Sequence, residues 1–330
     1  MAIYIASKTL IKIDKDIAAD QGASFRQFEK AVMPHIGDAY RGAEKNPYRV
    51  HLGASGIGKD CARAIWYSFR WFTKPAFDAR ILRLFNRGHL EEGRCIAILL
   101  SIGVQVFQQD ENGKQFRISD MGGHFGGSGD GVAIGLPDLP LDMPCLLEFK
   151  THNDKSFSKL AGKSYKDYLA GLYDPKRPQI PFDGEGVASA KYEHYVQMQV
   201  YMRKMGINVG LYCAVNKNDD QIYLELIQPD PILADQFVDR GKQLIRIHSE
   251  PPKKINNSAG WFECKFCDHR PVCHLGATPQ QNCRTCHFAI PREDGKWYCQ
   301  EPKGTALAGS NPQLDEAAQL AGCAEYTKVC

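Results

Sequence analysis

The chain has 330 residues, of which 43% are hydrophobic and 24% are charged, and its formal net charge is +3. This balance is typical of a folded protein with one large core and smaller appendages. No apolar run approaches the roughly 20 residues that cross a bilayer, so we expect no membrane partner. The small net charge excludes a strong overall attraction to polyanions. Any affinity for nucleic acid must therefore come from local basic patches.

Apolar periodicity and turn residues predict the elements in chain order. An N-terminal helical arm extends to about Ile36, and a loop then leads to a helix that carries Cys61. A longer helix is expected from about Ile81 to Ser101. The elements expected after it are a hairpin of residues 104–107 and 116–118, a second hairpin of residues 130–135 and 145–150, helices at 156–172 and 188–205, strands at 209–215 and 221–227, and a closing helix at 231–248.

This order predicts an α/β fold with helices packed on a central mixed sheet. We divide the chain into an N-terminal helical arm (residues 1–50), a main domain (51–275) and a cysteine-rich, metal-binding C-terminal tail (276–330). The proline-rich stretch at 251–258 is the expected linker between the sheet-containing core and the cysteines.

Three charged residues lie in or beside the two apolar strands of the second hairpin. If this hairpin folds about Leu139, Asp130 lies opposite Glu148, within roughly 5 Å. Lys150 is two residues beyond Glu148 and shares its face. Two close carboxylates suit Mg²⁺ or Mn²⁺, and a neighbouring lysine can orient a water or stabilise charge on phosphate. The set predicts hydrolysis of phosphodiester bonds.

Asp138 is the rival for the first acid, but it lies in the proline-rich turn, away from Glu148, and we prefer Asp130. The alternative interpretation takes Asp130 as a turn residue flanked by glycines and the Glu148 and Lys150 pair as a solvated strand end.

The order of Asp130, Glu148-x-Lys150 and Gln197-x3-Tyr201 resembles the PD-(D/E)XK nuclease superfamily and its RecB-like branch, although Gly129 replaces the proline of the superfamily name. The resemblance implies a restriction-endonuclease-like core in which Asp130, Glu148 and Lys150 are catalytic. It also implies that Gln197 and Tyr201, which share a helix face, contact the DNA backbone and support the lysine. In the upstream helix it implies that His89 is a metal ligand and that Glu92 is the first acid, with Glu91 as the alternative.

Twelve cysteines without a signal-like N-terminus indicate metal binding in a reducing cytoplasm rather than disulfides. Cys264, Cys267 and Cys273 form one cluster that lacks a fourth ligand nearby. The tail brings a second cluster with the spacing of a zinc ribbon, and its expected ligands are Cys283, Cys286, Cys299 and Cys323. His287 or Cys330 can replace Cys323 in this assignment.

One cysteine before the nuclease motifs, Cys61, and the triplet after them resemble the arrangement in AddAB-type helicase-nucleases and CRISPR-associated RecB-like nucleases. The resemblance implies that Cys61, Cys264, Cys267 and Cys273 hold a [4Fe–4S] cluster. The alternative is a Zn²⁺ ion held by the triplet with His269 or His274.

Two further patterns bear on phosphate binding. Residues 53–59 approach a phosphate-binding loop, but Asp60 replaces its magnesium-binding hydroxyl, which argues against an NTPase. If residues 156–172 are helical, four lysines line one face and can neutralise DNA phosphates: Lys155, Lys159, Lys163 and Lys166.

The sequence therefore predicts a cytoplasmic, Mg²⁺- or Mn²⁺-dependent DNA exonuclease. The resemblance is strongest to phage-encoded RecB-type exonucleases that resect duplex ends for recombination, with DNA and a single-strand annealing protein or helicase as partners. The alternative is a non-catalytic DNA-binding or scaffold protein whose zinc and iron–sulfur modules are its working parts.

Overall fold

The computed structural model describes residues 2–36, 47–301 and 312–329. The chain forms two compact units, each assembled from separated stretches. The first unit contains residues 1–41, 77–118 and 128–234, and the second contains residues 42–76, 119–127 and 235–330. The sequence instead predicts three consecutive segments, 1–50, 51–275 and 276–330.

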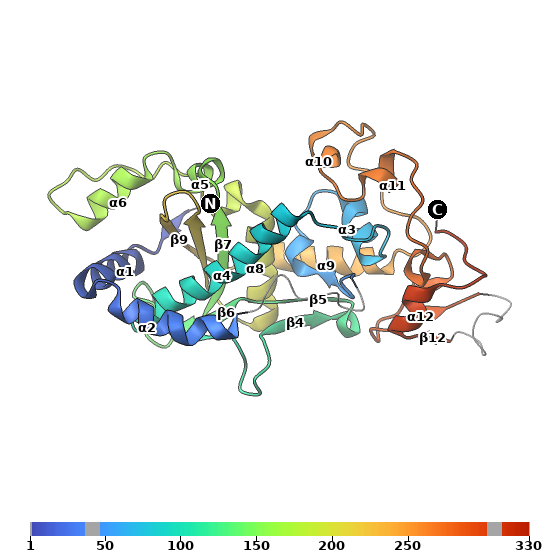
Figure 1. The fold of residues 1–330 in the computed structure, drawn as a ribbon, viewed down its shortest axis with the longest axis horizontal. Helices are drawn as coiled ribbons and strands as arrows, with labels where there is room; N and C mark the ends of the chain where they lie inside the picture. Colours follow the sequence, from blue (N-terminus) through green and yellow to red (C-terminus); the bar gives the residue numbers. More distant parts are fainter. Residues whose placement is uncertain (1, 37–46, 302–311, 330) are drawn as a thin grey trace. The chain divides into compact units, whose positions relative to one another are not determined.

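A six-stranded mixed sheet forms the centre of the first unit (Figure 1). Its strand order is β1-β9-β8-β7-β6-β3. Only β7 and β8 pair in parallel, while the other neighbours are antiparallel. The strands are β1 (Tyr4–Ile5), β3 (Gln105–Phe107), β6 (Gly131–Ile134), β7 (Cys145–His152), β8 (Gly210–Asn216) and β9 (Ile222–Ile227). The predicted α/β class with a central mixed sheet flanked by helices is confirmed.

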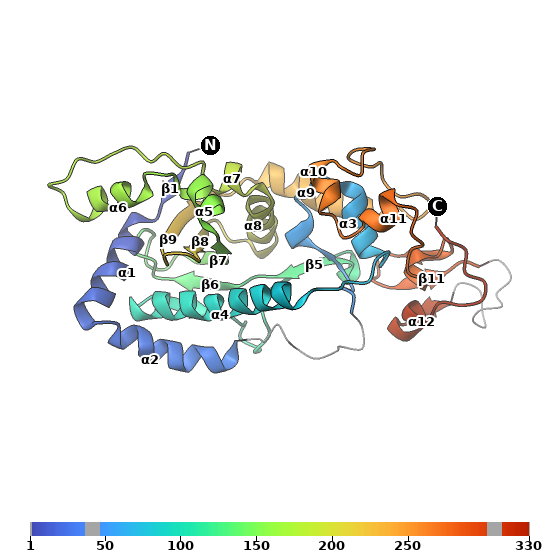
Figure 2. The ribbon, with the colours of Figure 1, turned by 45° about the horizontal axis from the view of Figure 1, so that its top comes forward.

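Helices cover both faces of this sheet (Figure 2). On one face the alternate β7 residues Cys145, Leu147 and Phe149 join a core with side chains of α1 (Ser7–Asp20) and α4 (Ala79–Ser101). The intervening β7 residues face α8 (Tyr192–Met205), which meets them through the Gln197 side chain. The remaining helices of this unit are α2 (Ala23–Val32), η1 (Met33–His35), α5 (Asp154–Ala161), α6 (Tyr165–Tyr173) and α7 (Gly186–Ala190).

Two predicted elements differ from the structure. The single helix expected at 156–172 is broken into α5 and α6, because Gly162 adopts φ +95° and a side chain there would collide with Asp183. The hairpin expected at 104–118 does not form: β3 pairs with β6, and β4 (Arg117–Asp120) joins a different sheet. Only an isolated bridge between Gln109 and Gln115 remains of it, because sheet neighbours distant in sequence decide strand pairing.

The second unit contains two small sheets and short helices. One sheet has the order β2-β5-β4, and the other has the order β10-β11-β12. The new elements are β2 (Leu52–Gly53), η2 (Ala54–Gly56), α3 (Ala62–Phe69), η3 (Met121–Gly123), β5 (Phe125–Ser128), α9 (Pro231–Arg246), α10 (Phe262–Lys265), α11 (Arg270–His274), η4 (Cys283–Thr285), β10 (Ala289–Pro291), β11 (Trp297–Cys299), β12 (Gln313–Leu314) and α12 (Glu316–Ala321).

Two buried arginines join the C-terminal residues to the end of α3. Arg70 Nε donates to the carbonyl of Arg284 at 2.7 Å, and Arg70 Nη2 donates to the carbonyl of Cys286 at 3.1 Å. The Arg284 guanidinium lies 3.9 Å from the centre of the Trp71 ring. These hydrogen bonds and the cation–π contact satisfy both buried charges and anchor the second cysteine cluster.

Within the described residues, no helix is both long enough and apolar enough to span a membrane.

Candidate active site

The hairpin of β6 and β7 has the register predicted from the sequence. Gly131 pairs with Leu147 and Val132 pairs with Leu146, so one further step places Asp130 opposite Glu148. Oδ2 of Asp130 accepts a hydrogen bond from the Phe149 amide at 2.8 Å. This bond holds the half-buried carboxylate against β7. The prediction of a fold about Leu139 is confirmed.

Glu148 is fully buried and has a partner at each oxygen. Lys150 Nζ donates to Oε1, and Gln197 Nε2 donates to Oε2 at 2.9 Å. Three of the predicted residues therefore form one connected group. The geometry gives Gln197 a contact that orients the acid.

Glu92, rather than Glu91, couples electrostatically to this group. Burial and the charges of Asp130 and Glu148 together raise the pKa of Glu92 to about 7, against the opposing charge of Lys150. Glu91 instead forms an ion pair with Arg94 at 3.1 Å within α4. The geometry favours Glu92 as the acid that α4 contributes.

In Glu148 and Lys150, as in Glu92, burial and neighbouring charges shift the pKa in opposite directions. Burial raises the pKa of Glu148 to about 7 against the stabilising charge of Lys150, and Asp130 adds to the increase. Burial alone would lower the pKa of Lys150, but the carboxylates of Glu148 and Asp130 outweigh it and the pKa is raised. The lysine is therefore an ammonium held among acids.

A cavity of about 500 Å³ opens beside these residues. Glu92, Asp130 and Lys150 line it together with exposed His89, whereas Glu148 lies behind Lys150. The other lining residues are Leu84, Phe85, Gly88, Glu91, Cys95, Phe149, Thr151 and Lys217.

The donor set suits a hard divalent cation. Carboxylate oxygens of Glu92, Asp130 and Glu148 are the ligands that Mg²⁺ and Mn²⁺ prefer, and a cation would relieve the burial cost that their charges carry. Among the residues that the structure describes, no three His, Cys, Asp or Glu side chains already form a metal site.

Asp138, the rival acid, has a structural task. Its Oδ1 accepts from the Lys8 amide at 2.9 Å, and its Oδ2 accepts from the amide and hydroxyl of Thr9 at 2.7 and 2.6 Å. Asp138 thereby caps the start of α1, where backbone N–H groups lack partners within the helix. This geometry supports the choice of Asp130 for the site.

Sequence reasoning missed a His-Tyr-His group beside Lys150. The Tyr212 hydroxyl lies 2.9 Å from His152 Nε2 and 2.8 Å from His194 Nδ1. Burial lowers the pKa of both histidines to about 3, with Lys150 contributing, so both rings are neutral. Spacing was the available signal, since His152 is two residues beyond Lys150 on β7 and His194 is three before Gln197 on α8.

Two predicted DNA contacts require correction. Tyr201 is only 2% exposed, so the expected contact of its side chain with the DNA backbone is wrong. The four lysines do not share one helix face, because the chain breaks at Gly162. Lys159 pairs with Glu185 at 3.6 Å and Lys166 pairs with Asp219 at 3.2 Å, while Lys155 and Lys163 are exposed.

The first cysteine cluster is assembled around the N-terminus of α3. Burial raises the pKa of the Cys264 thiol, and the thiols of Cys61 and Cys273 raise it further. Burial likewise raises the pKa of Cys267, with smaller effects from Cys61 and Cys273. His269 contacts Ser68 at 2.9 Å and Thr73 at 3.1 Å, one through each ring nitrogen. Both of its nitrogens are thus occupied, which favours Cys61 over His269 as the fourth ligand.

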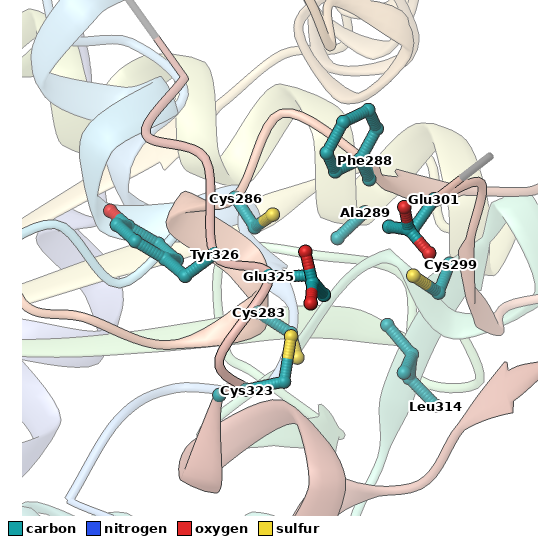
Figure 3. A pocket seen from close by; sticks show the side chains of 11 residues that line it. Cys283, Cys286, Phe288, Ala289, Cys299, Glu301, Leu314, Cys323, Glu325 and Tyr326 are labelled. Atoms are coloured by element: carbon teal, nitrogen blue, oxygen red, sulfur yellow. The ribbon is translucent and has the colours of Figure 1, made fainter. Parts of the chain in front are cut away.

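The second cluster encloses a small cavity (Figure 3). Cys283, Cys286, Cys299 and Cys323 all line it, whereas His287 does not. The cavity measures about 10 Å³, close to the size of a single water, so it suits one ion rather than a multi-atom cluster. Burial raises the pKa of Cys283 to about 12, with contributions from the other three thiols. Cys330, the other alternative, lies outside the described residues.

No protein-family model and no characterised protein matches this sequence. Among solved structures, the chain resembles the protein SSO0001 at 13% identity and a TM-score of 0.35, over 76% of this chain and 96% of that one. It also resembles the alkaline exonuclease LHK-Exo from Laribacter hongkongensis at 15% identity and a TM-score of 0.33, over 59% of this chain and 86% of that one. The structure of LHK-Exo in complex with dAMP matches equally.

Proposed function

We propose that this protein is a nuclease that hydrolyses DNA phosphodiester bonds with a divalent cation, Mg²⁺ or Mn²⁺. One observation carries the proposal: carboxylates from α4 and the β6–β7 hairpin influence one another and Lys150 beside one open cavity. Such a group is costly to bury without a cation or a polyanionic substrate to complete it.

Each residue has a role that follows from its contacts. Glu92, Asp130 and Glu148, with His89 at the rim of the cavity, would hold the cation, which would supply a water of lowered pKa and charge neutralisation at phosphate. Lys150, charged and 27% exposed, is placed to stabilise negative charge that develops on the phosphate oxygens. Gln197 orients Glu148 through its 2.9 Å hydrogen bond.

The substrate end, the biological role and the partner proteins can be proposed in more detail. We propose digestion from duplex ends, an exonuclease activity that serves DNA recombination in the cytoplasm, with a single-strand annealing protein or helicase as partner. A phage origin fits such a task. The support is the order of the acidic strands, Glu148-x-Lys150 and the Gln197 helix, which resembles RecB-type exonucleases.

The test compares digestion of end-labelled linear DNA by the intact chain and its variants in Mg²⁺ or Mn²⁺. Asp130→Asn and Lys150→Ala should each lower the rate at least about 100-fold, because each removes a charge that acts in the transition state. Asp138→Ala should retain the rate, since Asp138 caps α1. Closed circular DNA that is cut as fast as linear DNA would exclude the exonuclease. Digestion that persists in the Asp130 and Lys150 variants would reject the site.

We also propose that Cys61, Cys264, Cys267 and Cys273 bind a [4Fe–4S] cluster, or Zn²⁺ in its place, and that Cys283, Cys286, Cys299 and Cys323 bind Zn²⁺. Thiolate sulfur suits both groups. The mutual effects of the thiols on their pKa values support both sets, and the small cavity of the second supports a single ion.

Metal analysis of anaerobically purified protein tests both assignments. We expect four irons with a broad absorption near roughly 400 nm, and one zinc. Cys61→Ser should remove the iron alone, and Cys286→Ser should remove the zinc alone. A colourless protein with two zinc ions would replace the iron–sulfur assignment by zinc, and a protein without metal would reject both.

A further inference from the structure

The N-terminal half of α4 presents an exposed aromatic side chain at the cavity. Phe85, His89 and Glu92 stand at positions i, i+4 and i+7 of the helix, so they share one face, and all three line the cavity. Phe85 is 42% exposed. Contact between its apolar ring and water is unfavourable, and a bound partner that covered the ring would remove that contact. The face therefore leads from an unburied ring to the acids along roughly 10 Å of helix.

Gly88 lies on the same wall of the cavity. Glycine within a helix is less favourable than alanine, so helix stability does not explain its presence. A Cβ built at Gly88 meets no atom within 4 Å, and packing against a neighbour does not explain it either. Because Gly88 has no side chain, the cavity stays wide between Phe85 and the carboxylates of Glu92 and Asp130.

The charge of this half-helix complements a polyanion. Residues 79–90 include Arg80, Arg83 and Arg87, all exposed, and contain no acid. Arg87 donates to the carbonyl of Lys217 at 2.9 Å, which brings the loop after β8 to the rim of the cavity. Lys217 itself lines the cavity together with Phe85, so a phosphate can be neutralised beside an aromatic ring, the usual combination for a single nucleic-acid strand.

We propose that this face of α4 is a binding site for one unpaired nucleotide, with its base stacked on Phe85 and its sugar in the space beside Gly88. The inference rests on the proposed function and deepens it. It requires the DNA strand that reaches Glu92 and Asp130 to be unpaired when the protein binds it. A paired base has no free face to offer to Phe85.

The test measures affinity for two fluorescent oligonucleotides of equal length, one of thymidines and one abasic throughout, in EDTA so that neither is cleaved. Phe85→Ala should weaken binding of the thymidine strand about 5- to 150-fold and leave binding of the abasic strand unchanged. Phe85→Trp should retain affinity. Phe107→Ala is the matched control, because Phe107 is 41% exposed in the same unit but does not line the cavity.

Gly88→Ala provides an independent measurement. The variant should unfold at a higher temperature than the parent, because alanine favours the helix, yet bind the thymidine strand more weakly because its methyl group enters the sugar site. Unchanged affinity in Gly88→Ala, or an equal loss for both oligonucleotides in Phe85→Ala, would overturn the proposal. Binding requires no cleavage, so a protein that passes these tests but digests no DNA would refute only the proposed function.

Discussion

At the scale of single residues, the candidate site is a balance of charges that burial disfavours. Glu148 is fully enclosed and depends on Lys150 and Gln197, while Glu92 faces the other acids without an opposite charge at hydrogen-bonding distance in the described contacts. Carboxylates that repel one another in a folded protein lower its stability and prepare a site for a cation.

Glu92→Gln should therefore stabilise the protein while impairing its activity. The pKa of Glu92 is about 7 in the folded state and near 4.5 when unfolded, so its ionised form disfavours folding at pH 8 but not at pH 4. We expect the variant to gain about 1 to 2 kcal/mol at pH 8 in EDTA, and nothing at pH 4. Denaturant titration at both pH values measures the difference.

Added Mg²⁺ provides the control for this variant. A cation that binds only the folded protein stabilises it, and the stabilisation increases with the affinity. If Glu92 is a ligand, Mg²⁺ should therefore raise the melting temperature of the parent more than that of Glu92→Gln. Equal increases would show that Glu92 is not a ligand.

At the scale of elements, each half of the site depends on where a strand or helix begins and ends. The β6–β7 register sets Asp130 opposite Glu148, and the turn between these strands also supplies Asp138, which caps α1. The break at Gly162 separates the four lysines that a continuous helix would have aligned. Asp130 and Asp138 are only eight residues apart, yet the first lies in the candidate site and the second caps a helix.

Asp138→Ala should destabilise the fold without lowering catalysis. The loss of three hydrogen bonds at the start of α1 should cost about 1 to 2 kcal/mol of unfolding free energy. Asp142→Ala, an exposed neighbour, should change stability by less than about 0.5 kcal/mol. Urea titration with an unchanged slope tests both. An Asp138 variant as stable as the parent would exclude the capping role.

At the scale of the whole molecule, both units contain histidines that folding keeps neutral. Burial lowers the pKa of His152 and His194 to about 3 in the first unit and that of His124 to about 4 in the second. An unfolded histidine titrates near 6.5, so the stability that these groups contribute is complete above pH 6.5 and is lost as the pH falls toward 4.

The unfolding free energy should consequently decline below pH 6.5, by about 1.4 kcal/mol per pH unit for each neutral histidine. In His194→Gln the unfolding free energy should decline less steeply between pH 6 and 4.5, by about 1.4 kcal/mol per pH unit, because one histidine no longer contributes. Circular dichroism during denaturant titration at several pH values measures it. An identical pH dependence in parent and variant would show that folding does not lower the pKa of His194.

The sequence by itself determined the α/β class, the hairpin register and the pairing of Asp130 with Glu148, because strand alternation and a proline-rich turn are local signals. Tertiary structure decided what depends on contacts between distant segments. It set the Glu92 carboxylate where the charges of Asp130, Glu148 and Lys150 influence its pKa, and it buried Tyr201. It also placed the Tyr212 hydroxyl between two histidines and lined one small cavity with four cysteines. Periodicity states which face of an element a side chain occupies, whereas burial and charge depend on what packs against that face.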